Sequence, residues 1–362
     1  MTAMNFPEME GPPTSADNWD FHGNEQAVAS LKHAITTGHL SHAYLFTGPA
    51  GVGKGKLAKR LIQALVCEKE PEARPCLECR SCKHIETGAA PDIERIAIGG
   101  VCDEGGPAHK DHAADGSTRI RICQVRRLER VASLAPYAAP RRIFVIDAAD
   151  DLQREAAHAL LKTLEEPPSS VLLIMLATDV DSLLPTVRSR CQEIALRPMP
   201  HAALATALKS RLGVDELTAA RLAREAHGCF GIGVRLHTDP SLSMLRETAA
   251  ADAERLAAAG RNDRFDYAAT LAGRWSKERG SVLETIDCWR WWWRDRLHEA
   301  AHTPGATRCS APEAVRALRA VARTREHLLA NTYPQLALEV MMLDLPVLAA
   351  RAGEEARSPL MV

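Results

Sequence analysis

The feature that most constrains the fold is a glycine-rich turn that lies between a short apolar run and a helical pattern. The run Ala43–Thr47 leads into Gly48-Pro49-Ala50-Gly51-Val52-Gly53-Lys54. In a strand, turn and helix of this order, backbone N–H groups and the helix N-terminus converge on an anion. The pattern therefore predicts a phosphate-binding loop. The residues expected to bind a nucleotide are Gly48, Gly51, Gly53 and Lys54, with Lys54 reaching the outer phosphates.

Further along the chain, helical patterns alternate with short apolar runs at 142–147 and 171–177. Such alternation is typical of an α/β domain with a mostly parallel sheet flanked by helices, which we expect over 19–197. Residues 1–18 hold Pro and Gly but few apolar positions, so a flexible lead-in is predicted there. Two short helical patterns in 198–240 predict a small helical domain, and Ala- and Leu-rich helices are expected over 241–362.

At two positions the residue differs from the one that an active ATPase needs. A Ser or Thr normally follows the loop lysine and holds Mg²⁺, but this chain has Gly55. Asp147 ends the strand 142–147 at the place of a metal-holding carboxylate, although a helix cap or an ion pair would explain it equally well. The Glu that would activate water is replaced by Ala148. We therefore expect very slow ATP hydrolysis or none, and the sequence leaves open whether ATP and Mg²⁺ are bound.

Four cysteines follow the loop helix with the spacing C-x8-C-x2-C-x2-C. They are Cys67, Cys76, Cys79 and Cys82. Zn²⁺ prefers tetrahedral thiolate coordination, and four protein ligands leave no position for water, so the pattern predicts a structural zinc module over 67–82. Free thiols and a nucleic-acid-binding zinc ribbon are the alternatives. Cys102, His109 and His112 also suggest a metal site, but they lie in an irregular insertion over 99–118, where solvated side chains are expected.

The charge balance excludes nucleic-acid binding through global charge, because 45 Lys and Arg face 46 Asp and Glu. Seven Arg between Arg119 and Arg142 form a local basic stretch that suits DNA phosphates, a solvated face or a subunit interface. The apolar run 171–177 is far shorter than the ~20 residues that cross a bilayer. The first basic residue is Lys32, so no signal-peptide n-region is present and a cytoplasmic protein is expected. Trp289, Trp292 and Trp293 share a helix face, which predicts core or interface packing.

Three motifs carry a resemblance to a known family. They are LSHAYLFTGP (40–49), LLKTLEEPP (160–168) and LPTVRSRC (184–191), and with the cysteine spacing they resemble bacterial clamp-loader AAA+ subunits of DNA polymerase III over about 19–197. The resemblance implies an AAA+ P-loop domain, a small helical lid (198–240) and an all-α oligomerisation collar (241–362). Within the family, Gly55 and Ala148 favour the delta-prime type over the tau/gamma motor, which is the alternative.

The resemblance also implies partners and site residues. A delta-prime-type subunit belongs to a ring with tau/gamma and delta subunits, which places a sliding clamp on primed DNA as part of a DNA-directed DNA polymerase (nucleotidyltransferase) holoenzyme. It has no polymerase site of its own. Arg190 matches an arginine finger that reaches a neighbour's ATP site, with a salt bridge within the chain as the alternative. Thr178 matches a water-orienting sensor or caps its turn, and Arg235 is left unassigned as a second sensor.

Overall fold

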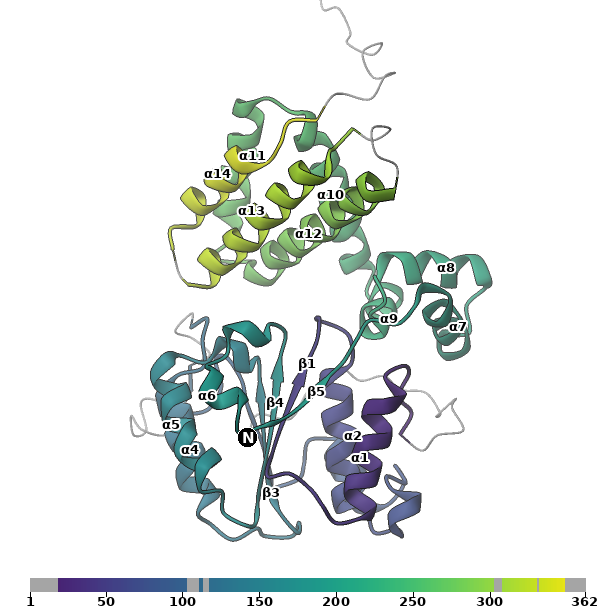
Figure 1. The fold of residues 1–362 in the computed structure, drawn as a ribbon, viewed down its shortest axis with the longest axis vertical. Helices are drawn as coiled ribbons and strands as arrows, with labels where there is room; N and C mark the ends of the chain where they lie inside the picture. Colours follow the sequence, from purple (N-terminus) through teal and green to yellow (C-terminus); the bar gives the residue numbers. More distant parts are fainter. Residues whose placement is uncertain (1–18, 103–110, 113–116, 303–307, 331, 349–362) are drawn as a thin grey trace, which may run out of the picture. The chain divides into compact units, whose positions relative to one another are not determined.

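The computed structural model describes residues 19–102, 111–112, 117–302, 308–330 and 332–348. The predicted lead-in over 1–18 lies outside these residues. The chain falls into two compact units, Met1–His237 and Thr238–Val362. The first unit holds a parallel sheet, whereas the regular structure described in the second is helical (Figure 1).

The first unit is built on five parallel strands in the order β2-β3-β4-β1-β5. The strands are β1 (Ala43–Thr47), β2 (Ile93–Ile96), β3 (Arg142–Asp147), β4 (Val171–Ala177) and β5 (Gln192–Ala195). The three predicted apolar runs are confirmed as β1, β3 and β4. Every residue of β1 and β4 is buried, which is typical of a sheet covered on both faces. The expectation of an α/β domain with a parallel sheet is confirmed.

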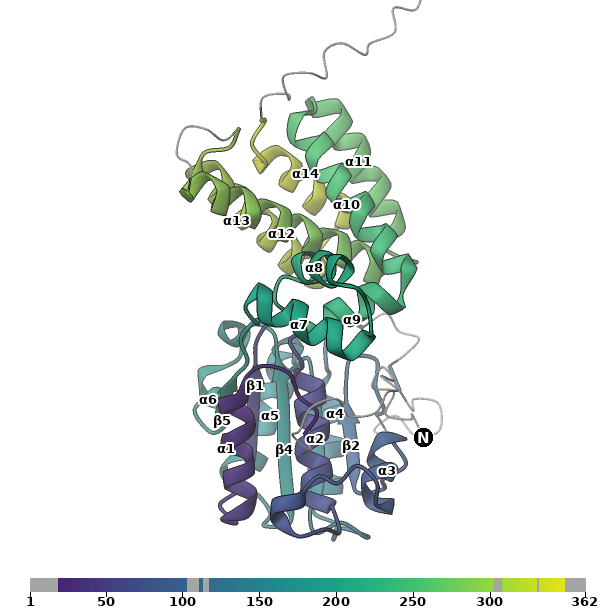
Figure 2. The same cartoon turned by 90° about the vertical axis from the view of Figure 1, so that its right-hand side faces the viewer.

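Helices cover both faces of this sheet. They are α1 (Glu25–Thr36), α2 (Lys54–Val66), α3 (Arg80–Glu86), α4 (Ile122–Ala132), α5 (Arg154–Glu165) and α6 (Pro185–Arg188). Helices α1 and α2 lie on one face and α4 and α5 on the other (Figures 1 and 2). On the second face, Leu128 and Leu160 join a buried cluster with Phe144 and Leu173 from the strands. This packing holds the carboxyl ends of the strands in fixed positions.

The strand order decides which residues meet at that edge. Because β4 lies between β1 and β3, the segments that follow these three strands are neighbours. They begin with Gly48, Ala148 and Thr178. Ligands of open α/β sheets bind outside the carboxyl ends of the strands. The sheet therefore brings the predicted nucleotide residues to one edge.

Three further helices complete the first unit: α7 (His201–Leu212), α8 (Glu216–Glu225) and α9 (Phe230–Thr238). The N-terminus of α9 lies against the glycine-rich turn, since the Gly231 N–H donates to the Gly51 carbonyl over 2.9 Å. A Cβ on Gly51 would overlap with Ile232. The two helical patterns predicted in 198–240 correspond to α7 and α8, whereas the contact with the glycine-rich turn is made by α9, which was not predicted.

The second unit contains α10 (Pro240–Ala258), α11 (Arg261–Arg274), α12 (Arg279–His302), α13 (Ala311–Leu329) and α14 (Pro334–Asp344). Trp289 and Trp293 of α12 are 0% and 1% exposed and lie in its core. The Trp292 ring meets the Trp293 ring edge-on, with 4.8 Å between centroids. The predicted face is thus a core face. No helix in the described part of the chain is long and apolar enough to span a bilayer.

Candidate functional site

The predicted phosphate-binding loop has the backbone conformation expected from its glycines. Gly48, Gly51 and Gly53 have φ angles of 139°, 75° and 114°, a left-handed region that favours glycine. Lys54 begins α2, and its Nζ donates to the carbonyls of Gly48 (2.5 Å) and Pro49 (3.0 Å). The lysine thus lies at the loop, where its ammonium group binds backbone carbonyls of the loop itself.

The neighbouring strands complete the surroundings of Lys54. Its Nζ is 3.4 Å from Thr178 Oγ1, so the predicted sensor lies within reach of the loop lysine. Asp150 accepts a hydrogen bond from the Thr178 N–H over 2.9 Å, which caps the turn after β4. Burial lowers the pKa of Lys54, and the carboxylates of Asp150 and Asp147 oppose that shift. Lys54 is thus a partly desolvated cation that lies near acidic groups at this edge of the sheet.

Asp147 does not lie free for a metal ion. It pairs with Arg95 of β2, the strand beside β3. Ala148, which follows it, adopts a left-handed conformation and carries no carboxylate. Gly55 likewise offers no hydroxyl in the first turn of α2. These residues therefore do not fit a hydrolytic magnesium site, because the hydroxyl and the water-activating carboxylate are missing and the carboxylate of Asp147 is already paired with Arg95.

Arg190 follows α6 at the end of the LPTVRSRC motif. Its guanidinium pairs with Glu165 at the end of α5 over 2.7 Å and donates to the Thr186 carbonyl over 3.0 Å. The side chain keeps 36% of its surface exposed. The alternative of a salt bridge within the chain is thus present in this structure, and the group remains reachable from solvent.

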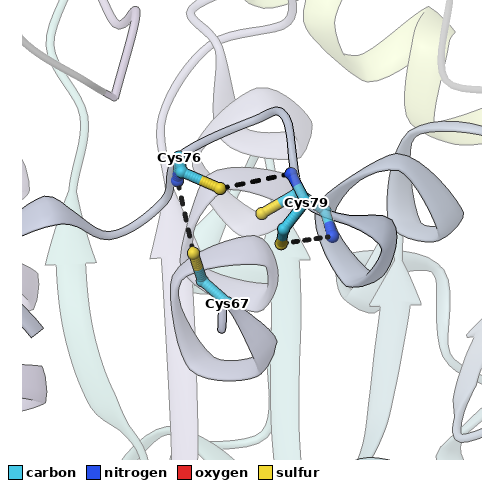
Figure 3. A group of neighbouring side chains, drawn as sticks. Cys67, Cys76 and Cys79 are labelled. Carbon is cyan, nitrogen blue, oxygen red and sulfur yellow. Dashed lines mark hydrogen bonds between the residues drawn. The ribbon is translucent and has the colours of Figure 1, made fainter. Parts of the chain in front are cut away.

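The four predicted cysteine ligands lie together. Cys67 follows α2, Cys76 lies in the loop, Cys79 is the N-cap of α3, and Cys82 lies in the first turn of that helix. Their four Sγ atoms lie within 4.8 Å of one another. Figure 3 shows Cys67, Cys76 and Cys79 of this group. Thiolates around one zinc ion are roughly 3.8 Å apart when each Zn–S bond is 2.3 Å, so small movements of the side chains would close the site.

Backbone groups support thiolates at this site. The N–H groups of Cys76, Cys79 and Cys82 each donate to the preceding cysteine's sulfur, over 3.4, 3.3 and 3.4 Å (Figure 3). Burial raises the pKa of Cys76, but hydrogen bonds from Glu78 and Cys79 outweigh it and lower that pKa to about 7. Such hydrogen bonds favour the thiolate, the form that binds a metal, whereas burial raises the pKa of the Cys67 and Cys82 thiols. The donor set and its surroundings therefore fit a structural metal ion.

The loop of the cysteines is anchored to α2 by buried polar groups. Gln63 donates to the Cys82 carbonyl over 3.1 Å and to Glu86 over 3.0 Å. Lys59 pairs with the same Glu86 over 2.8 Å. These bonds hold α3 against α2 and so keep Cys82 near Cys67.

Two arginines in the basic stretch of 119–142 have partners within the first unit. Arg127 pairs with Glu94 over 2.9 Å, and Arg142 pairs with Asp92 over 3.5 Å. Asp92 also accepts three backbone hydrogen bonds from residues 137–139 over 2.6–2.8 Å. These two arginines thus stabilise the fold, which weakens the case for direct DNA contact by the stretch.

The expectation of solvated metal-ligating residues in the insertion is wrong for two of them. Cys102 is 0% exposed and His112 is 2% exposed, whereas His109 lies outside the described residues. Cys123 of α4 joins them in a second group of ligand atoms. Sequence reasoning missed Cys123 because it lies in a basic helical pattern, and the only signal was the presence of Cys, His and Cys within 22 residues.

Comparison with known proteins gives the site its context. Residues 23–200 match the family described as "DNA polymerase III, delta subunit". The chain is 29% identical over 214 residues to DNA polymerase III subunit gamma of Buchnera aphidicola, covering 58% of this chain and 54% of the relative. It is 33% identical over 180 residues to subunit tau of Escherichia coli, covering 50% and 25%. The chain thus spans about half of the first relative and a quarter of the second.

Two solved structures from Thermotoga maritima are also similar. A DNA polymerase III gamma subunit-related protein is 17% identical with a TM-score of 0.40, covering 88% of this chain and 97% of that chain. The RuvB Holliday junction branch migration motor is 16% identical with a TM-score of 0.42, covering 90% and 89%. Over residues 23–200, about half of its length, the chain is thus similar to the DNA polymerase III delta-subunit family, and the relatives named above are gamma and tau subunits of DNA polymerase III.

Proposed function

We propose that the protein is the delta-prime-type subunit of a DNA polymerase III clamp loader. In this role it hydrolyses no ATP and assembles with tau/gamma motor subunits and a delta subunit. It contributes Arg190 to a neighbouring ATP site while the ring loads a sliding clamp onto primed DNA. The subunit belongs to a DNA polymerase holoenzyme but has no polymerase site of its own.

The observation that carries this proposal is the set of side chains around Lys54, at the carboxyl ends of the strands. Gly55 and Ala148 remove the two groups that position metal and water, and Arg95 neutralises the carboxylate of Asp147. Phosphoryl transfer depends almost entirely on positioning and charge stabilisation, so the loss of these groups abolishes turnover more readily than nucleotide binding. A subunit that keeps the fold but does not hydrolyse ATP is suited to be a rigid member of the ring.

The first test is steady-state ATP hydrolysis by the isolated chain, with a tau/gamma subunit as the active reference. We expect no turnover above the background of the Lys54→Ala variant. Binding of ATP is measured separately by calorimetry, because a silent site that still holds nucleotide is compatible with the proposal. Turnover at the rate of the reference, lost in Lys54→Ala, would overturn it.

A tau/gamma-type motor is the second candidate. The curated relatives named above are gamma and tau subunits, and their similarity covers 58% and 50% of this chain. A motor needs the hydroxyl at position 55 and the carboxylate at 148 that this chain lacks. The hydrolysis assay separates the two candidates, since only the motor turns over ATP by itself.

The role of Arg190 requires that its guanidinium exchange Glu165 for a neighbour's phosphate. A half-exposed ion pair is worth about 0–1 kcal/mol, so the exchange costs little. An arginine finger contributes about 10³–10⁵ to the rate at the site it serves. Arg190→Ala should therefore silence one site of an assembled ring, lower total ATPase only in part, and reduce clamp loading further.

Arg188→Ala is the matched control. Arg188 lies in the same motif and pairs with Glu193 over 2.9 Å, so it tests the loss of an arginine from the same short segment. Arg190→Lys should rescue little, because an ammonium cannot reproduce the planar contact with phosphate oxygens. Rings of Arg190→Ala that assemble normally and keep wild-type ATPase and clamp loading would refute the finger.

We also propose that Cys67, Cys76, Cys79 and Cys82 hold one structural Zn²⁺. The gathering of four sulfurs and their N–H donors supports this assignment. The ion would link the end of α2 to the start of α3, outside the nucleotide edge, and would take no part in chemistry.

A further inference from the structure

A second group of metal-ligating side chains lies apart from the four cysteines. The ligand atoms of Cys102, His112 and Cys123 all lie within 4.8 Å of one another. His112 Nε2 is 2.9 Å from Cys123 Sγ. Cys102 and His112 are almost fully buried, and Cys123 is half-buried. Two thiols and one imidazole thus converge on a shielded point.

The chain builds this point from two separate segments. The antiparallel bridge between Val101 and Asp111 brings Cys102 close to His112. The backbone N–H of His112 is shared between the carbonyls of Gly99 and Gly100, each at 3.3 Å, which fixes the backbone of the residue that carries the imidazole. Cys123 comes from elsewhere, as the second residue of α4.

The start of α4 is well suited to present a thiolate. N–H groups at a helix N-terminus carry partial positive charge, which favours an anionic sulfur in the first turn. Gln124 ties the same turn to the other segment, because its Nε2 donates to the Ala97 carbonyl over 2.9 Å. This hydrogen bond ties the first turn of α4, which contains Cys123, to the segment after β2. No disulfide joins Cys102 to Cys123.

The chemistry of the donors selects the ligand. A soft set of two thiolates and a neutral imidazole suits Zn²⁺, and the two negative charges balance the ion. A neutral complex is the form that a buried site tolerates best, because burial of unbalanced charge is costly. By contrast, a complex of Zn²⁺ with the four thiolates of Cys67, Cys76, Cys79 and Cys82 has two net negative charges. Three ligands leave the fourth tetrahedral position to an exchangeable ligand.

We propose that Cys102, His112 and Cys123 form a second zinc site, separate from the four-cysteine site. The ion would fasten the segment after β2 to the N-terminus of α4. In a parallel sheet this helix end lies on the carboxyl side of the strands, the same side as the phosphate-binding loop. The site would therefore stabilise the flank of the nucleotide edge beside Arg95.

Zinc content of the full-length chain tests the proposal. Protein purified without chelators should contain two zinc ions per chain by elemental analysis. Cys123→Ser should contain one, Cys82→Ser should contain one, and the double variant should contain none. Cys191→Ser is the matched control and should keep two, because Cys191 is a half-buried thiol outside both groups.

Co²⁺ titration provides a second readout that does not require variants at the buried positions. Thiolate-to-metal absorption should rise until two equivalents have been added to the metal-free chain, and until one equivalent in Cys123→Ser. Circular dichroism checks that the variant keeps its helices. One zinc ion in the wild type that is lost in Cys82→Ser and kept in Cys123→Ser would overturn the second site. A mass two daltons lower, located to a disulfide between Cys102 and Cys123, would also overturn it.

Discussion

Arg264 makes the strongest testable contribution to the helical unit. This α11 side chain is 4% exposed, and its guanidinium donates to carbonyls at the ends of two other helices. The acceptors are Leu256 (2.9 Å), Ala257 (3.2 Å), Met342 (3.0 Å), Leu345 (2.8 Å) and Pro346 (2.8 Å). The last carbonyls of a helix lack partners within it, so one cation satisfies the ends of α10 and α14 together.

The magnitude follows from these five bonds. Arg264→Met removes all five bonds, but the carbonyls of Leu256 and Ala257 keep a second donor in the N–H groups of Ala259 and Leu348. The other three carbonyls lose the arginine as donor, and each buried unpaired group costs about 1–3 kcal/mol. Part of this cost is recovered because no charge has to be buried, so we expect a loss of about 3–5 kcal/mol in the free energy of unfolding. Lys offers only three donors from one point, so Arg264→Lys should cost about 2 kcal/mol.

Tryptophan fluorescence follows this unit selectively, because five of the six tryptophans lie within 275–293. Urea unfolding monitored by this signal gives the change in stability from the shift in midpoint. Arg261→Ala, an exposed arginine of the same helix, is the control and should change stability by less than about 0.5 kcal/mol. An Arg264→Met variant as stable as this control would refute the reasoning.

Three further predictions concern the first unit. Cys82→Ser, or removal of zinc by a chelator, should expose the amides of 67–89 to hydrogen exchange while the strands stay protected; unchanged protection would contradict a structural ion. Burial raises the pKa of Asp92, but three N–H donors and Arg142 outweigh it and hold that pKa below its ordinary value. The stability that the Asp92 carboxylate contributes is therefore present above about pH 4 and is lost as the pH falls through the lowered pKa. Asp92→Asn should lower the free energy of unfolding by about 2 kcal/mol at pH 7 and by progressively less in acid, which thermal unfolding at several pH values measures. Gly51→Ala should lower the free energy of unfolding by about 1–3 kcal/mol, because the left-handed backbone is strained by a side chain and the new Cβ overlaps with Ile232. Ile232→Ala should relieve part of that loss in the double variant. If the two stability losses simply add, the contact is contradicted.

The predictions from sequence succeeded where the signal lies in consecutive residues. The glycine-rich turn, its strand and its helix are encoded locally, because left-handed backbone angles and apolar runs are properties of short segments. The four-cysteine group could be predicted for the same reason, because Cys76, Cys79 and Cys82 lie close together in the sequence, in one turn and at the start of one helix. By contrast, β2 and β5 are short and carry charged residues such as Glu94 and Glu193, so no apolar run predicted them.

The sequence by itself determined a glycine-rich turn between a strand and a helix, the glycine at position 55 and the alanine at position 148, four clustered thiols and a C-terminal region with helical patterns. Only the tertiary structure decided how distant residues meet. The pairing of Asp147 with Arg95 depends on β2 lying beside β3, and the convergence of Cys123 with His112 depends on where α4 begins. Such contacts arise from strand order and helix placement, which result from burial of the whole core and leave no signature in local spacing.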